Sequence, residues 1–303
     1  MIKAVDGTVT GNDHGHSAGS GGNGHATAVA ERKPIRVRVL RQDVAGGESY
    51  WERFEIPYEP NLNVISVLQK IAARATSLDG RAVAPVAWDC CCLEEVCGSC
   101  TMLVNGRTRM ACSSLVDKLL EEGDEIELRP MSKFPVVRDL VVDRRRLFHS
   151  LERVKAWVPV DDSYDHGPGP RISPEEQQDA YPLATCISCG CCLEACPQFT
   201  KVETVQRAGE TAESLEKRRK DAFEGQFVGA HAISQAMLFK SHPTGRMIAD
   251  ERLEALTGAG GIQMCGNAQN CVAVCPKHIP LTRSIARAGR AATVWAIKRL
   301  FDR

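Results

Sequence analysis

The side chains best suited to chemistry in this sequence are its 14 cysteines, which fall in three short windows of the 303-residue chain. The windows span residues 90–112, 186–196 and 265–275. A disulfide framework spreads cysteines along a small secreted chain, whereas thiols clustered within a long chain are typical of metal sites. The first residues also lack the apolar run of an export signal. We therefore expect reduced thiols that bind metal.

The first window has the spacing C-x4-C-x2-C-x11-C, which is typical of a plant-type [2Fe–2S] cluster. Three thiolates then come from one loop and the fourth from the strand after a hairpin, and Gly98 and Ser99 leave backbone N–H groups free to approach the sulfurs. A zinc ribbon is the alternative, but it favours two C-x2-C knuckles and this window has one. Cys90 and Cys91 are surplus and are expected in the core or beside the ligands. The expected ligands are Cys92, Cys97, Cys100 and Cys112.

The second window has the spacing C-x2-C-x2-C-x3-C-P of a bacterial ferredoxin, in which the fourth cysteine binds the other cluster of a two-cluster domain. That rule requires a second run elsewhere, and the third window supplies it as C-x5-C-x3-C-P. The last cysteine of the third window should therefore complete the cluster begun by the second. The expected ligands of this [4Fe–4S] cluster are Cys186, Cys189, Cys192 and Cys275.

The third window lacks one thiol that an ordinary ferredoxin run would have. Aligning the two runs places Ala268 where a cysteine ligand would stand. Three thiolates suit a [3Fe–4S] cluster, which has one iron fewer, although an outside ligand or water could hold a fourth iron. Cys191 is extra and is expected to face away from the cluster. The expected ligands of the [3Fe–4S] cluster are Cys196, Cys265 and Cys271.

None of the three expected clusters leaves an open coordination position beside a base, which hydrolytic metal chemistry needs. No nucleotide or flavin fingerprint follows a strand, and the Gly-rich stretch 258–261 is expected to be a tight connection. No catalytic residue is assigned. Three clusters without a substrate pocket predict a chain that takes electrons from one partner and passes them to another. The histidines His231, His242 and His278 lack ligand-like spacing and are expected to be structural.

The elements that must position the first window are strands and one helix. Apolar and charged residues alternate in the predicted strands, and apolar residues recur at i, i+3, i+4 and i+7 in the predicted helix. Asn105-Gly106 predicts a two-residue hairpin. The order β-β-α-β-β-β predicts a compact α+β domain, taken as residues 34–137. Its expected strands are 35–40, 50–58, 101–104, 107–112 and 125–129, and its expected helix is 63–75.

Beyond residue 137 helical signals dominate, so we take residues 138–303 as an all-α domain. Residues 138–157 are predicted to form a helix with Phe148 on its apolar face. Ser173 is predicted to begin another helix, because proline and a capping-box glutamate follow it. Further helices are expected over 210–223, 229–240, 249–256 and 280–301, and a loop over 158–170.

Residues 1–33 form a Gly-, Ser- and His-rich extension that cannot bury enough surface to offset the entropy of ordering, so we expect disorder there. His14, His16 and His25 are expected to belong to this tail rather than to a metal site. The whole chain has 38 basic and 38 acidic residues, which excludes nucleic-acid binding through net charge. No run approaches 18 apolar residues, so no membrane-spanning segment is expected.

The last 27 residues, 277–303, hold seven basic residues and one acidic residue. Together with apolar residues such as Ala292, Trp295 and Ile297, this composition fits a helix that lies on an anchor subunit or on a lipid surface. It fits an ordinary amphipathic core helix equally well. Both interpretations remain open at this stage.

The order of the three windows and the phrases VCGSC, CISCGCCLEACP, SHPTG and CGNAQNCVAVCPK resemble the iron–sulfur subunit of succinate dehydrogenase or fumarate reductase, respiratory complex II. The resemblance covers about residues 34–303. It implies a plant-type ferredoxin β-grasp domain followed by a helical bacterial-ferredoxin domain. It also implies the function of an electron-transfer subunit of succinate:quinone oxidoreductase, which carries electrons through [2Fe–2S], [4Fe–4S] and [3Fe–4S] clusters.

The resemblance further implies partners: a flavoprotein subunit that binds FAD, and a membrane anchor that reacts with quinone. Family members that build the quinone pocket partly from this subunit have Trp five residues after the Cys196 position and His just after the Cys265 position. Here those positions are Lys201 and Gly266. The sequence therefore looks like the branch whose anchor is a di-haem cytochrome b, which carries haem b. The implied location is peripheral, on the cytoplasmic face of a bacterial inner membrane.

Three alternatives remain. A quinol:fumarate reductase would run the same route in the opposite direction. A soluble thiol-linked fumarate reductase or a glycolate-oxidase-type subunit is disfavoured, because the sequence lacks the extra cysteine-rich repeats that would accept a disulfide substrate. A zinc-binding interaction scaffold belongs to a different class, and its zinc content would distinguish it.

Overall fold

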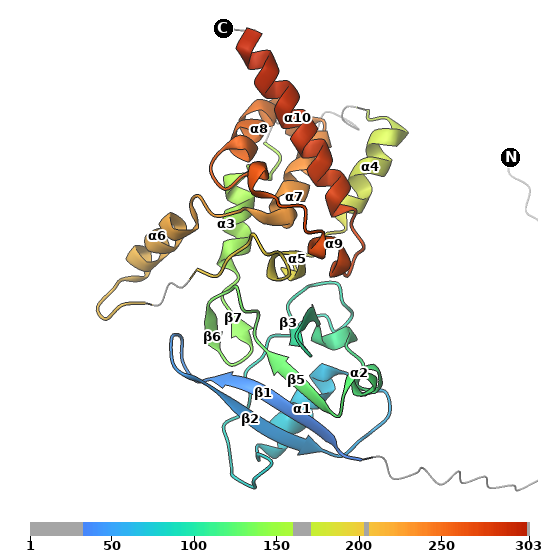
Figure 1. The fold of residues 1–303 in the computed structure, drawn as a ribbon, viewed down its shortest axis with the longest axis vertical. Helices are drawn as coiled ribbons and strands as arrows, with labels where there is room; N and C mark the ends of the chain where they lie inside the picture. The colour runs from blue at the N-terminus through green and yellow to red at the C-terminus, as the bar shows by residue number, and fades with distance from the viewer. Residues whose placement is uncertain (1–32, 160–170, 203–205, 302–303) are drawn as a thin grey trace, which may run out of the picture. The chain divides into compact units, whose positions relative to one another are not determined.

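The computed structural model describes residues 33–159, 171–202 and 206–301. In Figure 1 the strands, blue to green, lie together in one region, and the helices from α3 onward lie together in another. The predicted α+β class is therefore confirmed for the first half, and the helical class for most of the second. The expected disordered extension and most of the expected loop at 158–170 lie outside the described residues.

The first region is built on a five-stranded mixed sheet with the order β2-β1-β5-β3-β4. Strand β1 pairs antiparallel with β2 and parallel with β5, while β3 pairs antiparallel with β4 and β5. Alternate residues of β1 are fully buried, as the sequence pattern predicts. The strands are β1 (Ile35–Gln42), β2 (Ser49–Ile56), β3 (Thr101–Val104), β4 (Arg107–Met110) and β5 (Glu125–Arg129).

Helix α1 (Val64–Arg74) supplies the core that the sheet covers. The side chain of Asn63 caps its first turn by accepting the N–H of Ser66 at 2.9 Å. Ala75 ends it in the left-handed conformation. Its buried face is the apolar stripe that the sequence predicts.

The hairpin between β3 and β4 has the predicted turn. Asn105 and Gly106 both have positive φ, as a two-residue turn of the primed type requires. The second strand is shorter than expected, because the chain turns into a short 3₁₀ helix, η1 (Ala111–Ser113), that carries Cys112. Helix α2 (Val116–Glu122) was not predicted from the sequence.

The predicted helix over 138–157 is wrong in its first part. Strands β6 (Val136–Arg138) and β7 (Val141–Val142) form a small hairpin, and helix α3 begins only at Arg145. Phe148 is 62% exposed rather than on the buried face. The hairpin crosses residue 137, where the sequence suggests a domain boundary.

Asp139, in the turn of this hairpin, belongs to a buried ion network. The guanidinium of Arg41 on β1 is 1% exposed; it pairs with Asp139 at 2.8 Å and with Glu52 on β2. Arg41 also donates to the carbonyl of Ala84, and Asp139 accepts the N–H of Ala87. Breaking such a buried pair costs about 3–5 kcal/mol. The network therefore fixes the segment that leads into the first cysteine window.

The helices of the second region pack around α7, which contacts α3, α4, α5, α8 and α10. The capping box predicted at Ser173 is present, and Pro174 stands at the first helical position. Each predicted helix after residue 173 is observed within two residues of its expected ends. The helices are α3 (Arg145–Arg153), α4 (Pro174–Ala184), α5 (Cys191–Glu194), α6 (Ala212–Phe223), α7 (Gly229–Ser241), α8 (Ala249–Thr257), α9 (Asn270–Ala273) and α10 (Leu281–Phe301), with 3₁₀ turns η3 (Thr244–Ile248) and η4 (Ile262–Met264).

A small apolar core joins the segment after β5 to the cysteine-bearing helix α5. Phe134 packs against Phe199 with ring centroids 5.9 Å apart, and Leu193 of α5 belongs to the same cluster. The side chain of Arg146 lies 3.6 Å above the ring of Phe199 and donates to the carbonyl of Thr200. The loop after α5 is therefore held by α3 and by the segment that follows the sheet.

Candidate iron–sulfur centres

The first set of thiols gathers where a loop, a strand start and η1 meet. Burial is the largest cause that raises the pKa of the Cys112 thiol to about 11, and hydrogen bonding and charge at Cys100 and charge at Cys92 contribute to this rise. Cys97 in turn forms hydrogen bonds with Cys92. The structure thus brings together all four thiols that the first window predicts.

Backbone N–H groups point at the sulfurs of this set. The N–H groups of Glu94 and Val96 both donate to Cys92 Sγ at 3.4 Å, and that of Ser99 donates to Cys97 Sγ at 3.5 Å. Hydrogen bonding, chiefly to the Ser99 side chain, lowers the pKa of Cys97 to about 6. Such donors stabilise negative charge on sulfur, which is what a bound cluster places there.

The surplus cysteines differ in position. Cys90 and Cys91 are exposed at the start of the first loop. Cys191 is completely buried in the core that the sheet covers, and its hydrogen bond to the Cys189 thiol is the largest cause of the raised pKa of Cys189. The expectation that Cys191 is a passive bystander missed this contact, because spacing alone does not show which thiols touch.

The second set joins the loop before α5 to a distant segment after α9. Burial is the largest cause that raises the pKa of Cys186 to about 11, and charge on Cys189 and on Cys275 contributes to this rise. Burial also raises the pKa of Cys192 well above its ordinary value, with further contributions from Cys189, Cys186, Cys271 and Cys275. Cys275 therefore lies with the second window, as the ferredoxin pairing predicts, although it is 83 residues after Cys192 in the sequence.

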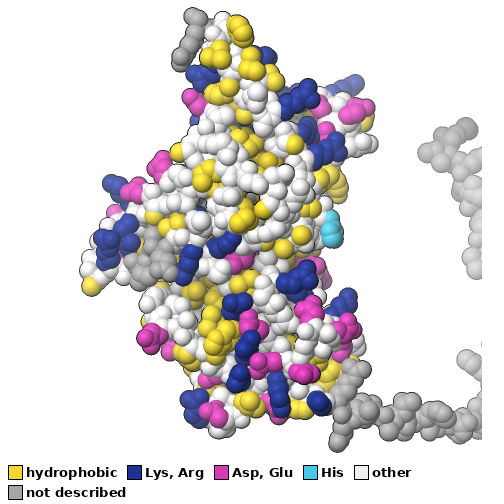
Figure 2. All heavy atoms as spheres, in the orientation of Figure 1, with side chains coloured by type: hydrophobic (Ala, Val, Ile, Leu, Met, Phe, Trp, Pro, Cys, Tyr) yellow, Lys and Arg dark blue, Asp and Glu magenta, His cyan; other side chains and the backbone are white. Residues whose placement is uncertain are grey.

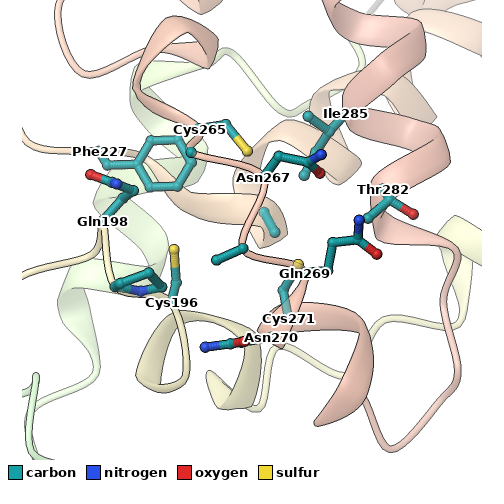
Figure 3. A pocket seen from close by; sticks show the side chains of 14 residues that line it. Cys196, Gln198, Phe227, Cys265, Asn267, Gln269, Asn270, Cys271, Thr282 and Ile285 are labelled. Atoms are coloured by element: carbon teal, nitrogen blue, oxygen red, sulfur yellow. The ribbon is translucent and has the colours of Figure 1, made fainter.

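The third set borders a hollow with about 400 Å³ of empty space, part of which opens to solvent. The sulfur atoms of Cys196, Cys265 and Cys271 lie around this hollow (Figure 3). Charge on Cys196 and on Cys265 adds to the effect of burial in raising the pKa of Cys271. Ala268 lines the same hollow and contributes a methyl group where the sequence register would place a ligand.

Each set matches the donor chemistry of an iron–sulfur cluster. The thiols whose pKa is raised, such as Cys112, Cys186 and Cys271, lose their protons when iron supplies a positive charge. Within the described ranges, no three or more Cys, His, Asp or Glu side chains are gathered closely enough to hold a single metal ion. The thiolates of a cluster are divided among several irons, two to each iron in [2Fe–2S] and one to each in [4Fe–4S] and [3Fe–4S]. A cluster therefore tolerates wider spacing than one zinc ion, whose thiolates all lie about 2.3 Å from one point.

The first and second sets meet backbone to backbone. Gly98 has φ +71, and a Cβ added there would lie 2.7 Å from the Cα of Cys189. The guanidinium of Arg144 donates to the carbonyls of Gly98 and of Ser99 at 2.6 Å each. It also lies within electrostatic reach of Cys100 and Cys189. Sequence analysis missed Arg144, which sits in an unremarkable run of charged residues.

Further contacts hold the helix that carries the second window. The carboxylate of Glu194 on α5 accepts the backbone N–H and hydroxyl of Ser132 and the N–H of Lys133. The ammonium group of Lys133 donates to the carbonyl of Cys196. The cysteines at both ends of α5 are thereby fixed to the segment after β5.

Two of the three histidines expected to be structural lie beside the second set. The backbone N–H of His278 donates to the carbonyl of Cys275 at 3.2 Å, and His231 contacts a residue between two of the cysteines. His231 on α7 is 2% exposed, and its Nε2 lies 3.0 Å from the hydroxyl of Ser188, between two cysteines of the second window. His242 caps the end of α7, and its Nδ1 accepts the N–H of Gly245.

Comparisons with known proteins agree with this arrangement. The model of the "2Fe-2S iron-sulfur cluster binding domain" matches residues 36–149, and that of the "4Fe-4S dicluster domain" matches residues 182–279. The succinate dehydrogenase iron–sulfur subunit of Bacillus subtilis is 47% identical over 273 residues, which is 90% of this chain and 98% of the relative. This chain belongs to the family of succinate dehydrogenase and fumarate reductase iron–sulfur subunits.

Other family members are more distant. The fumarate reductase iron–sulfur subunit of Wolinella succinogenes is 29% identical, over 83% of this chain and 94% of the relative. A chain of the Mycobacterium smegmatis Sdh1 complex in the apo form has the same fold, with a TM-score of 0.63 at 21% identity, over 86% of this chain and 95% of that one. The family, its fold and its [2Fe–2S] and [4Fe–4S] domains are thus established for this chain.

The C-terminal helix leaves part of its apolar surface uncovered. Ala292 is buried, whereas Ile297, Leu300 and Phe301 are 49, 74 and 83% exposed. Apolar side chains, yellow in Figure 2, gather at this end of α10 beside basic ones. The first turns of α10 therefore pack in the core, whereas its last turns expose apolar side chains. In the part of the chain that the structure describes, no helix has the length and apolar character to cross a bilayer.

Proposed function

We propose that this subunit conducts electrons through three clusters held by the three sets of thiols. When bound, the clusters supply one-electron redox chemistry. The protein holds them in order, encloses them and donates hydrogen bonds to their sulfurs. The proposed ligands are Cys92, Cys97, Cys100 and Cys112 for [2Fe–2S], Cys186, Cys189, Cys192 and Cys275 for [4Fe–4S], and Cys196, Cys265 and Cys271 for [3Fe–4S].

The main support for the proposal is that the three sets of thiols are neighbours in space, the first beside the second and the second beside the third. The loop of the first set contacts Cys189 of the second directly at Gly98. Cys192 of the second set lies within electrostatic reach of Cys271 of the third. Arg144 places a positive charge beside the first two sets, where it stabilises the added negative charge of a reduced cluster. The contacts support a single path rather than three separate sites.

The division of the chain follows from the same arrangement. We infer a [2Fe–2S] domain over residues 34–137, a helical domain over 138–303, and an extension over 1–33. The β6–β7 hairpin would then connect the two domains. The contacts of Arg144, Glu194 and Phe134 across this division support two domains that are packed together.

The partners are inferred from the family. A flavoprotein subunit would deliver electrons to the first set, and a membrane anchor would receive them from the third, so the chain would be peripheral on the cytoplasmic face of the membrane. The anchor is proposed to be a haem-bearing cytochrome b. Positions 201 and 266 support this, because they hold Lys and Gly where family members with a quinone pocket in this subunit have Trp and His.

The favoured direction is succinate oxidation. The relative of 47% identity is a succinate dehydrogenase subunit, while the fumarate reductase subunits of Wolinella succinogenes and of Escherichia coli are 28–29% identical. Fumarate reduction remains the second candidate, because the same thiol sets serve either direction. Comparing succinate oxidation with fumarate reduction by the purified complex distinguishes the two.

The decisive experiment is metal and sulfide analysis of the purified complex. From the cluster formulae we expect about nine non-haem irons and about ten acid-labile sulfides per chain. Low-temperature EPR should resolve three separate centres. Near-stoichiometric zinc with little sulfide would overturn the redox proposal and favour the interaction scaffold.

A further inference from the structure

Helices α7, α8 and α10 border a second hollow, which contains about 930 Å³ of empty space, part of it open to solvent. Its apolar lining includes Met237 and Leu253, which are buried, and Trp295. None of its lining residues belongs to a thiol set or lines the hollow of the third set. This hollow is therefore a separate feature of the helical region.

Four cations and one acid line this second hollow. These residues are Lys240, Arg287, Arg290, Lys298 and Asp250. Arg287 is paired at 3.0 Å with Asp179, which does not line the hollow. Within the described residues, Lys240, Arg290 and Lys298 have no ion pair and no side-chain hydrogen bond. The hollow therefore has an excess of positive charge that the described part of the chain does not neutralise.

Lys240 experiences this excess directly. It is partly buried, and burial lowers its pKa, as does charge on Arg246, Arg252 and Arg287. Charge on Asp250 opposes this lowering. Cations gathered around a partly enclosed space repel one another, so an anion placed among them is attracted by all of them. The second hollow is thus suited to a negatively charged ligand.

The face of α10 that lines the second hollow continues to an exposed apolar tip. Lys298 lines the hollow, and Phe301 follows three residues later on the same face of the helix. We call Ile297, Leu300 and Phe301, which are all exposed, the apolar tip. Apolar and basic side chains gather at this end of α10 in Figure 2. Cations followed by exposed apolar side chains match the order of phosphate and hydrocarbon in a membrane leaflet.

We propose that the second hollow binds the phosphate headgroup of an anionic phospholipid, with Lys240, Arg290 and Lys298 around the phosphate and the apolar tip at the acyl boundary. Such a lipid satisfies the cations and the apolar tip together, whereas a soluble phosphate satisfies the cations alone. The site goes beyond the proposed electron path, because none of its residues is assigned as a cluster ligand.

The test is co-sedimentation of the cluster-loaded full chain with vesicles. Vesicles of phosphatidylcholine alone are compared with vesicles of phosphatidylcholine and phosphatidylglycerol in equal parts. The unmodified chain should prefer the anionic vesicles. Arg290→Gln/Lys298→Gln should bind them about thirtyfold more weakly, because each cation beside an anionic leaflet contributes about a factor of five. Iron content and EPR signals of this variant should be unchanged, which separates the lipid site from the electron path.

Arg283→Gln/Arg299→Gln is the matched control, because it removes two cations from the same helix. Arg283 is paired with Asp179 at 2.7 Å, and it does not line the second hollow. Arg299 is paired with Glu254 at 3.3 Å, and it also lies outside the hollow. The control should bind anionic vesicles within about threefold of the unmodified chain, because cations that are already paired are less available to a phosphate.

Three results with vesicles would overturn the proposal. Equal weakening in the control would show that net charge alone attracts the chain to the surface. Equal binding to the two kinds of vesicle would exclude an anionic headgroup. Displacement from anionic vesicles by inorganic phosphate, at constant ionic strength, would indicate a site for a soluble anion.

The purified complex provides an independent test. Lys240 and Lys298 should react faster with an amine-acetylating reagent after the phospholipid has been removed with detergent, and added phosphatidylglycerol should restore their protection. Reactivity that stays low would show that the membrane anchor covers the second hollow. Reactivity that is high throughout would show that nothing covers it. Either outcome would refute the lipid site.

Discussion

Ala268 lies in the third set where the sequence register would place a fourth thiol ligand. It lines the same hollow as Cys196, Cys265 and Cys271. A methyl group cannot coordinate iron, so the hollow offers three thiolates from this chain. The chemistry of the third centre therefore depends on one side chain that lacks a donor atom.

Replacing that methyl group with a thiol tests this dependence. Ala268→Cys should add about one iron per chain and convert the [3Fe–4S] centre to [4Fe–4S], which lowers its potential. The measurements are iron content and low-temperature EPR of the oxidised complex. Asn267→Cys, one residue out of register in the same hollow, is the control. A persistent three-iron signal in Ala268→Cys, or the same conversion in the control, would contradict the register.

Cys275 is the second residue whose role can be tested alone. Cys275→Ser should remove the four-iron EPR signal and leave the three-iron signal, because charge on Cys275 acts on the thiols of Cys186 and Cys192. Cys191→Ser, which alters a buried thiol that we do not assign as a ligand, should keep both signals. Loss of the three-iron centre alone in Cys275→Ser would show that the pairing of the windows is wrong.

Cysteine spacing was sufficient to group the thiols, because the geometry of a cluster permits few spacings within one loop. It was not sufficient for the residues around them. Arg144, just before α3, lies beside the first and second sets, and His231 on α7 lies beside the second. No local sequence pattern relates either residue to a cysteine. Such contacts arise when helices pack together. They join residues that are far apart in the sequence, so short sequence patterns do not predict them.

Among the elements, those with strong local signals were predicted well. Helix α1 begins at the capping residue Asn63, and α4 begins at the capping box of Ser173, both as expected. The β6–β7 hairpin was missed, because its strands are only three and two residues long and its apolar residues also fit a helical period. Helix α2 has no side-chain cap, so nothing local marked its start.

The contact of Gly98 in the first loop with Cys189 of the second set can be tested by substitution. Gly98→Ala should destabilise the protein by about 2–5 kcal/mol, from left-handed strain of about 1–2 kcal/mol and overlap with Cys189 of about 1–3 kcal/mol. The measurement is the free energy of unfolding of the cluster-loaded protein.

Gly80→Ala provides the matched control for this variant. Gly80 also has a positive φ, +82, but nothing lies within 4 Å of an added Cβ. It should therefore show only the strain, about 1–2 kcal/mol. Equal losses in the two variants would mean that the approach of Gly98 to Cys189 contributes nothing.

At the scale of the whole molecule, the two halves differ in how much they depend on bound iron. The sheet has a continuous apolar core around β1 and α1. The helices α5 and α9, by contrast, have four residues each and carry or adjoin the thiols of two sets. Helices this short are not stable alone. Cluster coordination should therefore supply much of their order.

Removing iron with a chelator should affect the two halves unequally. Hydrogen–deuterium exchange of the chelated protein should accelerate by at least about tenfold in α5 and α9, because local opening no longer breaks metal bonds. Amides of β1 and β5 should remain protected. Uniform acceleration across the sheet as well would show that the first half also depends on its cluster for folding.

Cys196 of the second window is assigned to the third set, and Cys275 of the third window to the second set. This exchange affects when each cluster can be inserted during translation. All four thiols of the first set have left the ribosome's decoding site once Cys112 is added, whereas both later sets require residues from the third window. Cys275 follows Cys112 by 163 residues, which takes roughly 10–30 s of translation. The first centre can thus be loaded on a nascent chain, while the other two become loadable together, near the end of synthesis.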